Sequence, residues 1–203
     1  MLVAQAVEAC EIFLDKKLPE DASTMVYNKM LSEKENIVLI GMPGCGKSTI
    51  GKLIAERTGR GLYDLDAEIV DAEGREIPEI FANDGEQAFR DIESRVLFDR
   101  LAPLSGVVIA TGGGAVLREE NVRALKQNGR LYFLNRPLEQ LIPTADRPTA
   151  SSREAIANRY AERLPIYKSV ADAELLTDGI PQHAVEDVIK LHFSEDQNED
   201  IDN

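Results

Sequence analysis

Short apolar runs, many of them β-branched, alternate along the chain with longer segments whose apolar positions recur at helical spacing. The short runs predict five strands, at Ile37–Ile40, Leu62–Leu65, Val107–Ala110, Leu131–Leu134 and Glu174–Leu176. The longer segments predict helices at residues 2–14, 47–58, 77–82, 86–101, 119–127, 153–163 and 185–192, with a further helical region between Leu65 and Gly74. Strands that alternate with helices favour an α/β fold, in which an open five-stranded parallel sheet has helices on both faces.

Three glycines mark expected helix ends, because glycine adopts at little cost the left-handed conformation that closes a helix. Gly59 follows the helix at 47–58, and Gly74 ends the helical region after the second strand. Gly129 is the expected cap of the helix at 119–127.

The pattern divides the chain of 203 residues into one domain with two appendages. Residues 1–35 read as an amphipathic helix and a polar linker, and residues 36–193 as the domain itself. Residues 194–203 carry only acidic charges, which is typical of a solvated, disordered tail.

Composition indicates a soluble protein with a core, since 43% of the residues are hydrophobic and 29% are charged. No apolar run reaches the roughly 18 residues of a membrane helix. The first stretch carries Glu8 and Glu11 and lacks the basic start of a signal peptide, so a cytoplasmic location is expected. A net charge of -13 argues against nucleic acid and anionic membranes as partners, but a few converging cations can still bind a small anion.

The cysteines and histidines are too few and too far apart in the sequence to form a disulfide framework or a metal site. Cys10 and Cys45 lie far apart and make neither a disulfide framework nor a metal site. His183 and His192 have no metal-like spacing, so we interpret them as ordinary surface or core residues.

A complete phosphate-binding motif lies between the first strand and the helix at 47–58. The segment GMPGCGKS, residues 41–48, fits GxxxxGK[ST] in the context that supports the motif. Its glycines let the backbone wrap around phosphates, and the amides at the helix start attract negative charge. An ordinary glycine-rich turn is the alternative. We expect a P-loop NTPase-type three-layer sandwich that binds ATP through Gly44, Cys45, Gly46, Lys47, Ser48 and Thr49. In this motif Lys47 reaches the β- and γ-phosphates, the Ser48 hydroxyl ligates Mg²⁺, and Cys45 is a small residue that leaves room.

Two carboxylates, Asp64 and Asp66, close the second predicted strand. We expect these two carboxylates to point to opposite sides of the strand, so that one faces a metal while the other faces an acceptor hydroxyl. Acidic residues also end strands as ordinary caps, but the carboxyl end of a parallel strand beside a phosphate loop favours a site.

Arginines and glycines supply candidates for a second substrate. Arg90 and Glu93 are three residues apart on a helix, so they can pair and hold a guanidinium ready for a carboxylate; a surface salt bridge is the alternative. The run Gly112-Gly113-Gly114 indicates close approach of a ligand to bare backbone, or else a flexible turn. Arg147 lies in a polar stretch that suits a lid, and Arg163 ends the next helix; an ordinary solvated charge is the alternative for each.

The ordered series GMPGCGKST, DLD, GEQAFRDIE, TGGGAV, an Arg-Pro lid and ERLPIY resembles shikimate kinase over residues 36–193. The resemblance implies ATP-dependent phosphorylation of the shikimate 3-hydroxyl, within the shikimate pathway of aromatic amino acid biosynthesis. It also implies Mg²⁺ as the cofactor and a monomeric protein.

The same resemblance implies a role for each matching residue. Asp64 would hold Mg²⁺ through water, and Asp66 would orient or deprotonate the acceptor hydroxyl. Arg90 and Arg163 would clamp the substrate carboxylate, and Arg147 would stabilise the γ-phosphate from the lid. The remaining roles are an amide from Gly113, a turn shaped by Gly112 and Gly114, ring walls from Phe81 and Phe89, and support of Arg90 by Glu93.

Two segments depart from the family. An arginine that stacks on adenine usually precedes the lid, whereas here Leu141-Ile142-Pro143-Thr144 has none, which leaves adenine binding open. The lid, Arg147-Pro148-Thr149-Ala150, lacks the usual leucine after proline and looks short.

The N-terminal segment at residues 1–13 resembles the last helix of shikimate dehydrogenase. One hypothesis is therefore that the chain is the kinase end of a dehydrogenase–kinase polypeptide. A chance amphipathic helix docked on the kinase is the alternative.

Three rival functions remain open at this point. Another P-loop small-molecule kinase, of the gluconate type, also takes a carboxylate-bearing acceptor. A nucleotide-dependent switch is disfavoured in its GTPase form, because no Asn-Lys-x-Asp signature is present. A degenerate kinase that binds nucleotide without turnover would fit the missing adenine arginine.

Overall fold

The computed structural model describes residues 35–141 and 153–193. The predicted helix at 2–14, the linker up to residue 34, Arg147 with its lid, and the acidic tail lie outside these described residues. The elements in chain order are β1 (Asn36–Ile40), α3 (Lys47–Thr58), β2 (Leu62–Asp64), α4 (Leu65–Glu73), α5 (Ile77–Val96), the π-helical turn η1 (Leu97–Leu101), β3 (Val108–Ala110), the 3-10 turn η2 (Ala115–Leu117), α6 (Glu119–Lys126), β4 (Gly129–Asn135), the 3-10 turn η3 (Leu138–Gln140), α7 (Arg153–Val170), β5 (Ala173–Leu176) and α8 (Pro181–Phe193).

The five strands form one parallel sheet in the order β2-β3-β1-β4-β5, which confirms the predicted architecture. β1 lies at the centre, where Val38 is in register with Ile109 of β3 and Leu131 of β4. Its residues Ile37–Ile40 have no exposed surface. A strand buried on both faces carries a continuous apolar run, and this is the pattern seen in the sequence.

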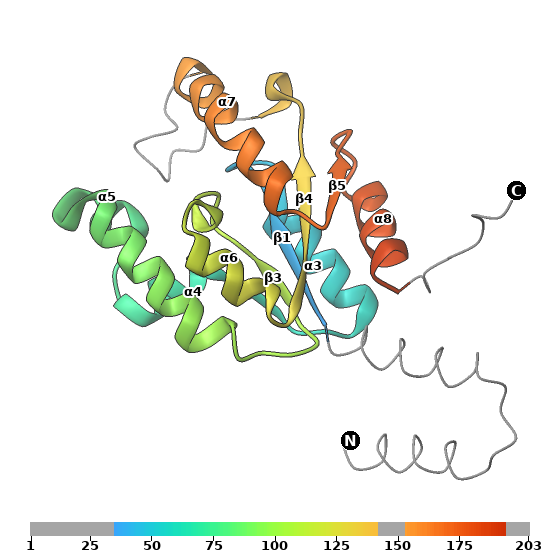
Figure 1. Ribbon diagram of the computed structural model, residues 1–203, viewed down its shortest axis with the longest axis horizontal. Helices are drawn as coiled ribbons and strands as arrows, with labels where there is room; N and C mark the ends of the chain where they lie inside the picture. The colour runs from blue at the N-terminus through green and yellow to red at the C-terminus, as the bar shows by residue number, and fades with distance from the viewer. Residues whose placement is uncertain (1–34, 142–152, 194–203) are drawn as a thin grey trace, which may run out of the picture.

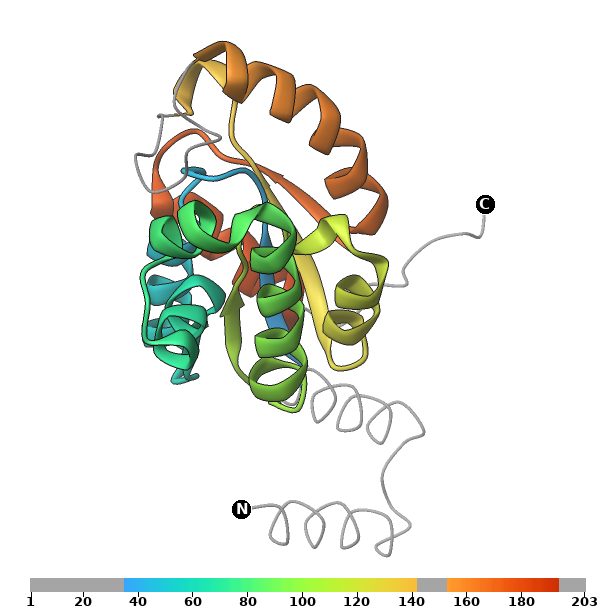
Figure 2. The ribbon, with the colours of Figure 1, turned by 90° about the vertical axis from the view of Figure 1, so that its left-hand side faces the viewer.

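Helices cover both faces of the sheet, as the two ribbon views show (Figures 1 and 2). α3 and α8 pack together on one face, while α5 and α6 lie on the other. The chain enters a helix after each of β1, β2 and β5, and passes through a short turn first after β3 and β4. All strand carboxyl ends therefore meet at one edge of the sheet, where ligands bind in such folds.

Helix ends follow the glycine pattern at two of the three predicted positions. Gly59 and Gly74 cap α3 and α4 in the left-handed conformation, with φ of 69° and 62°. Gly129 is not a cap, and this prediction was wrong: Gln127 caps α6, and Gly129 begins β4. The physical reason is close packing, because a Cβ on Gly129 would lie 2.8 Å from the Val38 side chain and 2.9 Å from the Leu125 carbonyl oxygen.

Three helices extend beyond their predicted ends. α8 begins at Pro181, four residues before its predicted start, because proline is tolerated in the first turn of a helix. α5 joins the two predicted helices at 77–82 and 86–101, but Gly85 inside it is non-helical, with φ 84° and ψ 175°. α7 continues to Val170 instead of ending at Arg163, although Pro165 lies inside it. Proline removes one backbone hydrogen bond from a helix. Beyond it Tyr167 is buried and stacks on Phe133, with ring centroids 5.0 Å apart, and we attribute the continuation of the helix to this packing.

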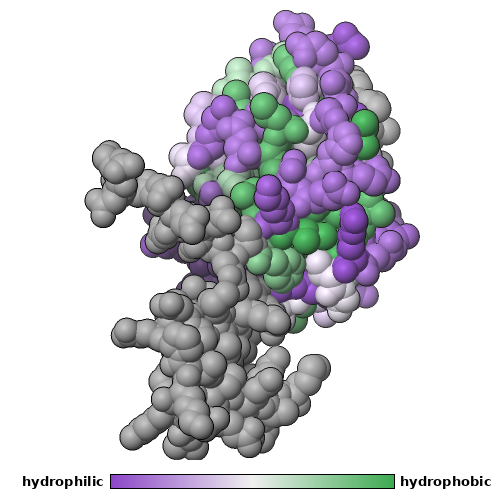
Figure 3. All heavy atoms as spheres, turned by 90° about the vertical axis from the view of Figure 1, so that its right-hand side faces the viewer, coloured by the Kyte–Doolittle hydropathy of each residue, from purple (hydrophilic) through white to green (hydrophobic). Residues whose placement is uncertain are grey.

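The face that carries β5 and α8 shows small hydrophobic areas bordered by hydrophilic side chains (Figure 3). Exposed large hydrophobic residues in these two elements are Leu176, Leu191 and Phe193. Among the described helices, none has both the length and the apolar character needed to cross a lipid bilayer.

Candidate active site

The phosphate loop connects β1 to α3 through three glycines with positive φ. Gly41, Gly44 and Gly46 have φ of 146°, 76° and 104°. A Cβ on Gly41 would lie 2.8 Å from the Leu134 carbonyl oxygen, so no other residue fits between β1 and β4 there. Gly46 precedes α3 and provides no side-chain cap, which leaves the first amides of that helix available to an anion.

Lys47 is held within the loop that it serves. Its ammonium donates to the carbonyl oxygens of Gly41 and Met42, at 3.0 and 2.9 Å, and its side chain is largely buried. Cys45 is buried below the loop, 3.8 Å from the Lys47 ammonium. A Cβ on Gly41 would lie 3.0 Å from the Cys45 sulfur, so the glycine also leaves room for this side chain.

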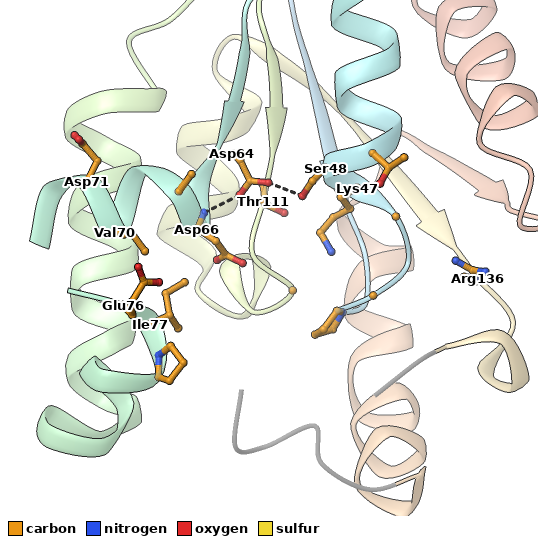
Figure 4. Close-up of a pocket in the computed structure, with 17 residues that line it drawn as sticks. Lys47, Ser48, Asp64, Asp66, Val70, Asp71, Glu76, Ile77, Thr111 and Arg136 are labelled. Carbon is orange, nitrogen blue, oxygen red and sulfur yellow. Dashed lines mark hydrogen bonds between the residues drawn. The ribbon is translucent and has the colours of Figure 1, made fainter. Parts of the chain in front are cut away.

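Ser48, Asp64 and Asp66 form a connected group beside the loop (Figure 4). The Ser48 hydroxyl donates to Asp64 Oδ2 at 2.5 Å, and the Asp66 amide donates to Asp64 Oδ1 at 3.0 Å. The predicted strand geometry of the two carboxylates was wrong for two reasons. Residues two apart share one face of a strand, so a strand would not have placed Asp64 and Asp66 on opposite sides. In addition, β2 ends at Asp64, and Asp66 lies in the first turn of α4. Asp64 instead caps α4, and this cap leaves Asp66 to face the cavity.

The donor set of Ser48 and Asp64 fits a magnesium ion. Mg²⁺ prefers oxygen ligands, keeps several waters and binds through one or two carboxylates together with substrate phosphates. A hydroxyl and a carboxylate in contact at the start of α3 provide such a set. Among the described residues no cluster of three or more His, Cys, Asp or Glu side chains suits a metal.

These residues line a cavity of about 970 Å³ at the carboxyl edge of the sheet (Figure 4). Of the predicted site residues, the lining includes Gly44, Gly46, Lys47, Ser48, Thr49, Asp64, Asp66 and Gly113. Two further lining residues, Pro43 and Thr111, lie in predicted motifs without a role of their own. The sequence pattern did not mark the remaining lining residues as parts of a site; these are Ala67, Val70, Asp71, Glu76, Ile77, Pro78 and Arg136.

Arg90 lies next to this cavity, against the glycine turn after β3. Its guanidinium donates to Glu93 at 2.7 Å and to Glu86 at 3.3 Å. A Cβ on Gly114 would overlap that guanidinium, so the absence of a side chain at Gly114 makes room for it. Burial acts to lower the pKa of Arg90, but the charges and hydrogen bonds of Glu93 and Glu86 outweigh it and raise the pKa above its ordinary value. The arginine is therefore always charged.

Arg163 reaches the same turn from α7. Its guanidinium donates to the Gly113 carbonyl oxygen at 3.0 Å, and the Tyr167 hydroxyl donates to the same oxygen at 2.5 Å. Among the described residues, no carboxylate forms an ion pair with Arg163. Burial lowers its pKa, and the nearby positive charges of Arg159 and Arg90 act in the same direction.

Two buried guanidinium groups thus share one glycine turn, and only one of them has acidic partners there. A buried cation is costly unless it is paired, and a second cation close by adds to the cost. A bound carboxylate would compensate the charge of Arg163 and could accept hydrogen bonds from both arginines. The arrangement favours a small anion between α5 and α7.

Phe81 and Phe89 pack against each other beside Arg90. Their ring centroids are 4.5 Å apart, and Phe89 has no exposed surface. The Arg90 guanidinium lies 5.2 Å from the Phe89 centroid. The buried ring of Phe89 therefore supports the Arg90 guanidinium, and the half-buried Phe81 is the more exposed of the two rings.

Comparison with known proteins agrees with this geometry. The family model described as shikimate kinase matches residues 43–192. A shikimate kinase of Caldicellulosiruptor bescii is 40% identical over 170 residues, which cover 80% of this chain and 98% of that protein. One from Thermodesulfovibrio yellowstonii is 41% identical over 164 residues, which cover 77% of this chain and 94% of that protein.

Solved structures show the same likeness in three dimensions. The shikimate kinase of Acinetobacter baumannii in complex with shikimate superposes with a TM-score of 0.74 at 33% identity, covering 81% of this chain and 96% of that one. The enzyme of Aquifex aeolicus gives a TM-score of 0.65 at 34% identity, covering 76% and 93%. With its phosphate loop, its paired carboxylates and its buried arginines, the chain belongs to the shikimate kinase family.

Proposed function

We propose that the protein transfers the terminal phosphoryl group of ATP to the 3-hydroxyl of shikimate, giving shikimate 3-phosphate and ADP. The observation that carries this proposal is the pair of buried guanidinium groups at one glycine turn, next to a complete phosphate loop. A phosphate loop alone fits many nucleotide-binding proteins, but an anion site beside it requires an acidic acceptor.

On the nucleotide side, the protein contributes amides and charge. The amides of the loop and of the first turn of α3 surround the phosphates. Lys47 exchanges its two carbonyl partners for phosphate oxygens, which bear more negative charge and bind an ammonium more strongly. Arg147, which lies outside the described residues, is proposed to add its charge to the transferring phosphoryl group from the lid.

On the acceptor side, the protein contributes orientation. Arg90 and Arg163 fix the shikimate carboxylate, and the Gly112–Gly114 turn presents bare backbone to the ring. Asp66 accepts the proton of the hydroxyl that attacks phosphorus. Holding both substrates in line lowers the barrier mainly through positioning, which is the main contribution expected for phosphoryl transfer.

Ser48 and Asp64 are proposed to hold Mg²⁺, the Ser48 hydroxyl directly and Asp64 through a water molecule. The ion would neutralise charge that develops on the β- and γ-phosphates. Asp64 also orients Asp66 by accepting its amide hydrogen, so the metal site and the acceptor site share one carboxylate.

The test is ADP release from ATP with Mg²⁺, measured with shikimate, with gluconate and with no acceptor. We expect shikimate alone to raise ADP release well above the background, and excess EDTA to remove the activity. Faster release with gluconate would reverse the substrate assignment. Equal release in all three conditions would show a nucleotide hydrolase instead of an acceptor kinase.

The surroundings of the enzyme remain predictions. We propose a monomer in the cytoplasm with the catalytic domain at residues 36–193, and size-exclusion chromatography tests the first point. The hypothesis of a fused shikimate dehydrogenase is tested by reading the open reading frame upstream of the codon for Met1.

A further inference from the structure

Arg136 is a cavity residue with no role in the mechanism above. It follows the carboxyl end of β4 and lines the cavity on the far side of the phosphate loop from Asp66 (Figure 4). Its side chain is only partly exposed. A strand end beside the phosphate loop is a place where ligand-binding residues gather in parallel sheets.

The polar groups around Arg136 are not fully satisfied by the protein. Among the described residues, the buried Nε of Arg136 has no hydrogen-bond partner, and the same holds for the hydroxyl of Thr177. The Thr177 amide donates to the Asn135 carbonyl oxygen at 3.0 Å, so Thr177 lies beside the strand end that precedes Arg136. Buried polar atoms without partners are rare in native proteins and indicate a missing ligand or water.

A backbone turn without a side chain lies alongside this arginine. Gly179, between β5 and α8, has φ 92°, and the Ile180 amide donates to Asp178 Oδ1 at 2.9 Å within the same turn. A Cβ on Gly179 would lie 3.6 Å from Arg136 Nη2 and 3.5 Å from Gln140 Oε1. Arg136 therefore extends from β4 toward the turn at residues 177–181, and glycine keeps the space between them clear.

The direction of the nucleotide follows from the positions of Asp66 and Lys47. The terminal phosphate must face Asp66 to react, and the phosphate chain passes over the loop at Lys47. The nucleoside then leaves the loop on the side away from Asp66, and this is the side of Arg136 (Figure 4). For this direction the inference rests on the proposed function.

We propose that Arg136 stacks its guanidinium on the base of the bound nucleotide, with the turn at residues 177–181 beside it. A planar guanidinium suits this role, because it stacks on aromatic rings and is more weakly hydrated than an ammonium.

The test compares ADP with inorganic pyrophosphate as ligands of the whole protein, by calorimetry with Mg²⁺ and without an acceptor. Arg136→Ala should weaken ADP binding about tenfold, the scale of a partly desolvated stacking contact. Pyrophosphate has no base, so its affinity should change less than about twofold. Arg136→Lys should recover little of the loss, since it restores the charge but not the plane.

Two further variants keep the outcome clear. Arg136→Gln retains most of the side-chain length and replaces the alanine variant if that one is unfolded. Arg123→Ala removes an exposed arginine of α6, and its ADP affinity should equal that of the wild type. Unchanged ADP binding in both Arg136 variants would refute the proposal. The proposal would also be refuted if pyrophosphate binding fell as much as ADP binding, or if Arg136→Lys restored ADP binding fully. Either result would mean that Arg136 contacts the phosphates and not the base. Because no acceptor is present, a wild type that binds ADP but does not phosphorylate shikimate refutes only the proposed function.

Discussion

At the scale of single residues, the site depends on a few atoms that the backbone holds in place. Asp64 accepts a hydrogen bond from the Ser48 hydroxyl on one oxygen and from the Asp66 amide on the other, so the orientation of its carboxylate is fixed. Because the same carboxylate caps α4, the position of Asp66 is fixed by the start of that helix. The metal ligation and the proton transfer that we propose would therefore fall to neighbouring carboxylates with different surroundings.

Replacing Asp66 with asparagine keeps the size of the side chain and removes its basicity. We expect kcat with shikimate to fall by about 10²- to 10⁴-fold, the usual contribution of a general base. ADP affinity should stay near the wild-type value. Asp71→Asn is the matched control, because Asp71 lines the same cavity from α4 and should retain kcat within about twofold. Equal losses in the two variants would remove Asp66 from its proposed role.

Replacing Gly114 with alanine should displace Arg90 without removing it. The new Cβ would overlap the guanidinium, so the KM for shikimate should rise about tenfold or more while the KM for ATP stays unchanged. The double variant with Arg90→Ala should lose little beyond Arg90→Ala alone, because both changes remove one interaction. Additive losses, measured by the same steady-state assay, would separate Gly114 from Arg90.

The sequence predicted the residues of the site better than their surroundings. Lys47 and Ser48 belong to a local motif whose spacing sets their geometry, whereas Asp66 was expected on a strand and lies in the first turn of α4. The structure lines one cavity with all three residues. Arg136 was missed, because a lone arginine after a strand has no spacing to mark it. Its position at the carboxyl end of the strand predicted for 131–134 was the available signal, and only the strand order shows that this end adjoins the phosphate loop.

At the scale of elements, α5 and α7 each bring one arginine to the glycine turn after β3. Arg90 lies on α5 in the part that follows the break at Gly85, and Arg163 lies on α7 one turn before the buried Tyr167. Tyr167 joins α7 to the turn through the Gly113 carbonyl oxygen. The docking of α7 therefore sets the distance between the two guanidinium groups.

Tyr167→Phe tests whether this docking matters for the acceptor. We expect the free energy of unfolding to fall by about 1 kcal/mol, as for a single lost hydrogen bond. The KM for shikimate should rise several-fold, because Arg163 loses the fixed carbonyl beside it. Tyr160→Phe removes a comparable hydrogen bond from the same helix, to Asn135 at 2.9 Å, and should affect only the unfolding energy. The same KM change in both variants would contradict the argument.

Helices and strands could be predicted from the sequence where the spacing of nearby apolar residues, or a glycine at the end of the element, determined them. The ends of α7 and β4 were not, because distant contacts decided them. Tyr167 stacks on Phe133 of β4, beyond a proline that local preference reads as a stop. Gly129 reads as a helix cap in the sequence, yet it is required by the close approach of α6 to β1.

At the scale of the whole molecule, the edge of the sheet opposite the site is held by a buried contact between β4 and α8. The hydroxyl of Tyr132 lies 3.0 Å from His192 Nδ1, and both residues are almost fully buried. Burial is the largest cause that raises the pKa of Tyr132, from 10 to about 12. The folded protein thus keeps a proton that the unfolded chain loses at lower pH.

The consequence is a defined loss of stability in alkali. Because the folded pKa is the higher one, this contribution is complete below pH 10 and is lost as the pH rises from 10 to about 12. Urea unfolding across this range should show a decrease of about 2 kcal/mol that is attributable to Tyr132. Tyr132→Phe should be less stable at neutral pH but should lack this part of the decrease. An equally steep profile in the variant would assign the decrease to other groups.

The same edge also gathers the two ends of the described domain. Arg60 donates to the Glu35 carbonyl oxygen at 2.5 Å, and its guanidinium lies 4.9 Å from the ring centroid of Phe193. Arg130 pairs with the Glu35 carboxylate at 3.5 Å and donates to the Leu191 carbonyl oxygen at 3.1 Å. Glu35 and Phe193, at the two ends of the described residues, therefore lie together at the amino edge of the sheet, remote from the cavity at its carboxyl edge. The contacts that join the two ends of the described domain are therefore separate from the residues that line the cavity.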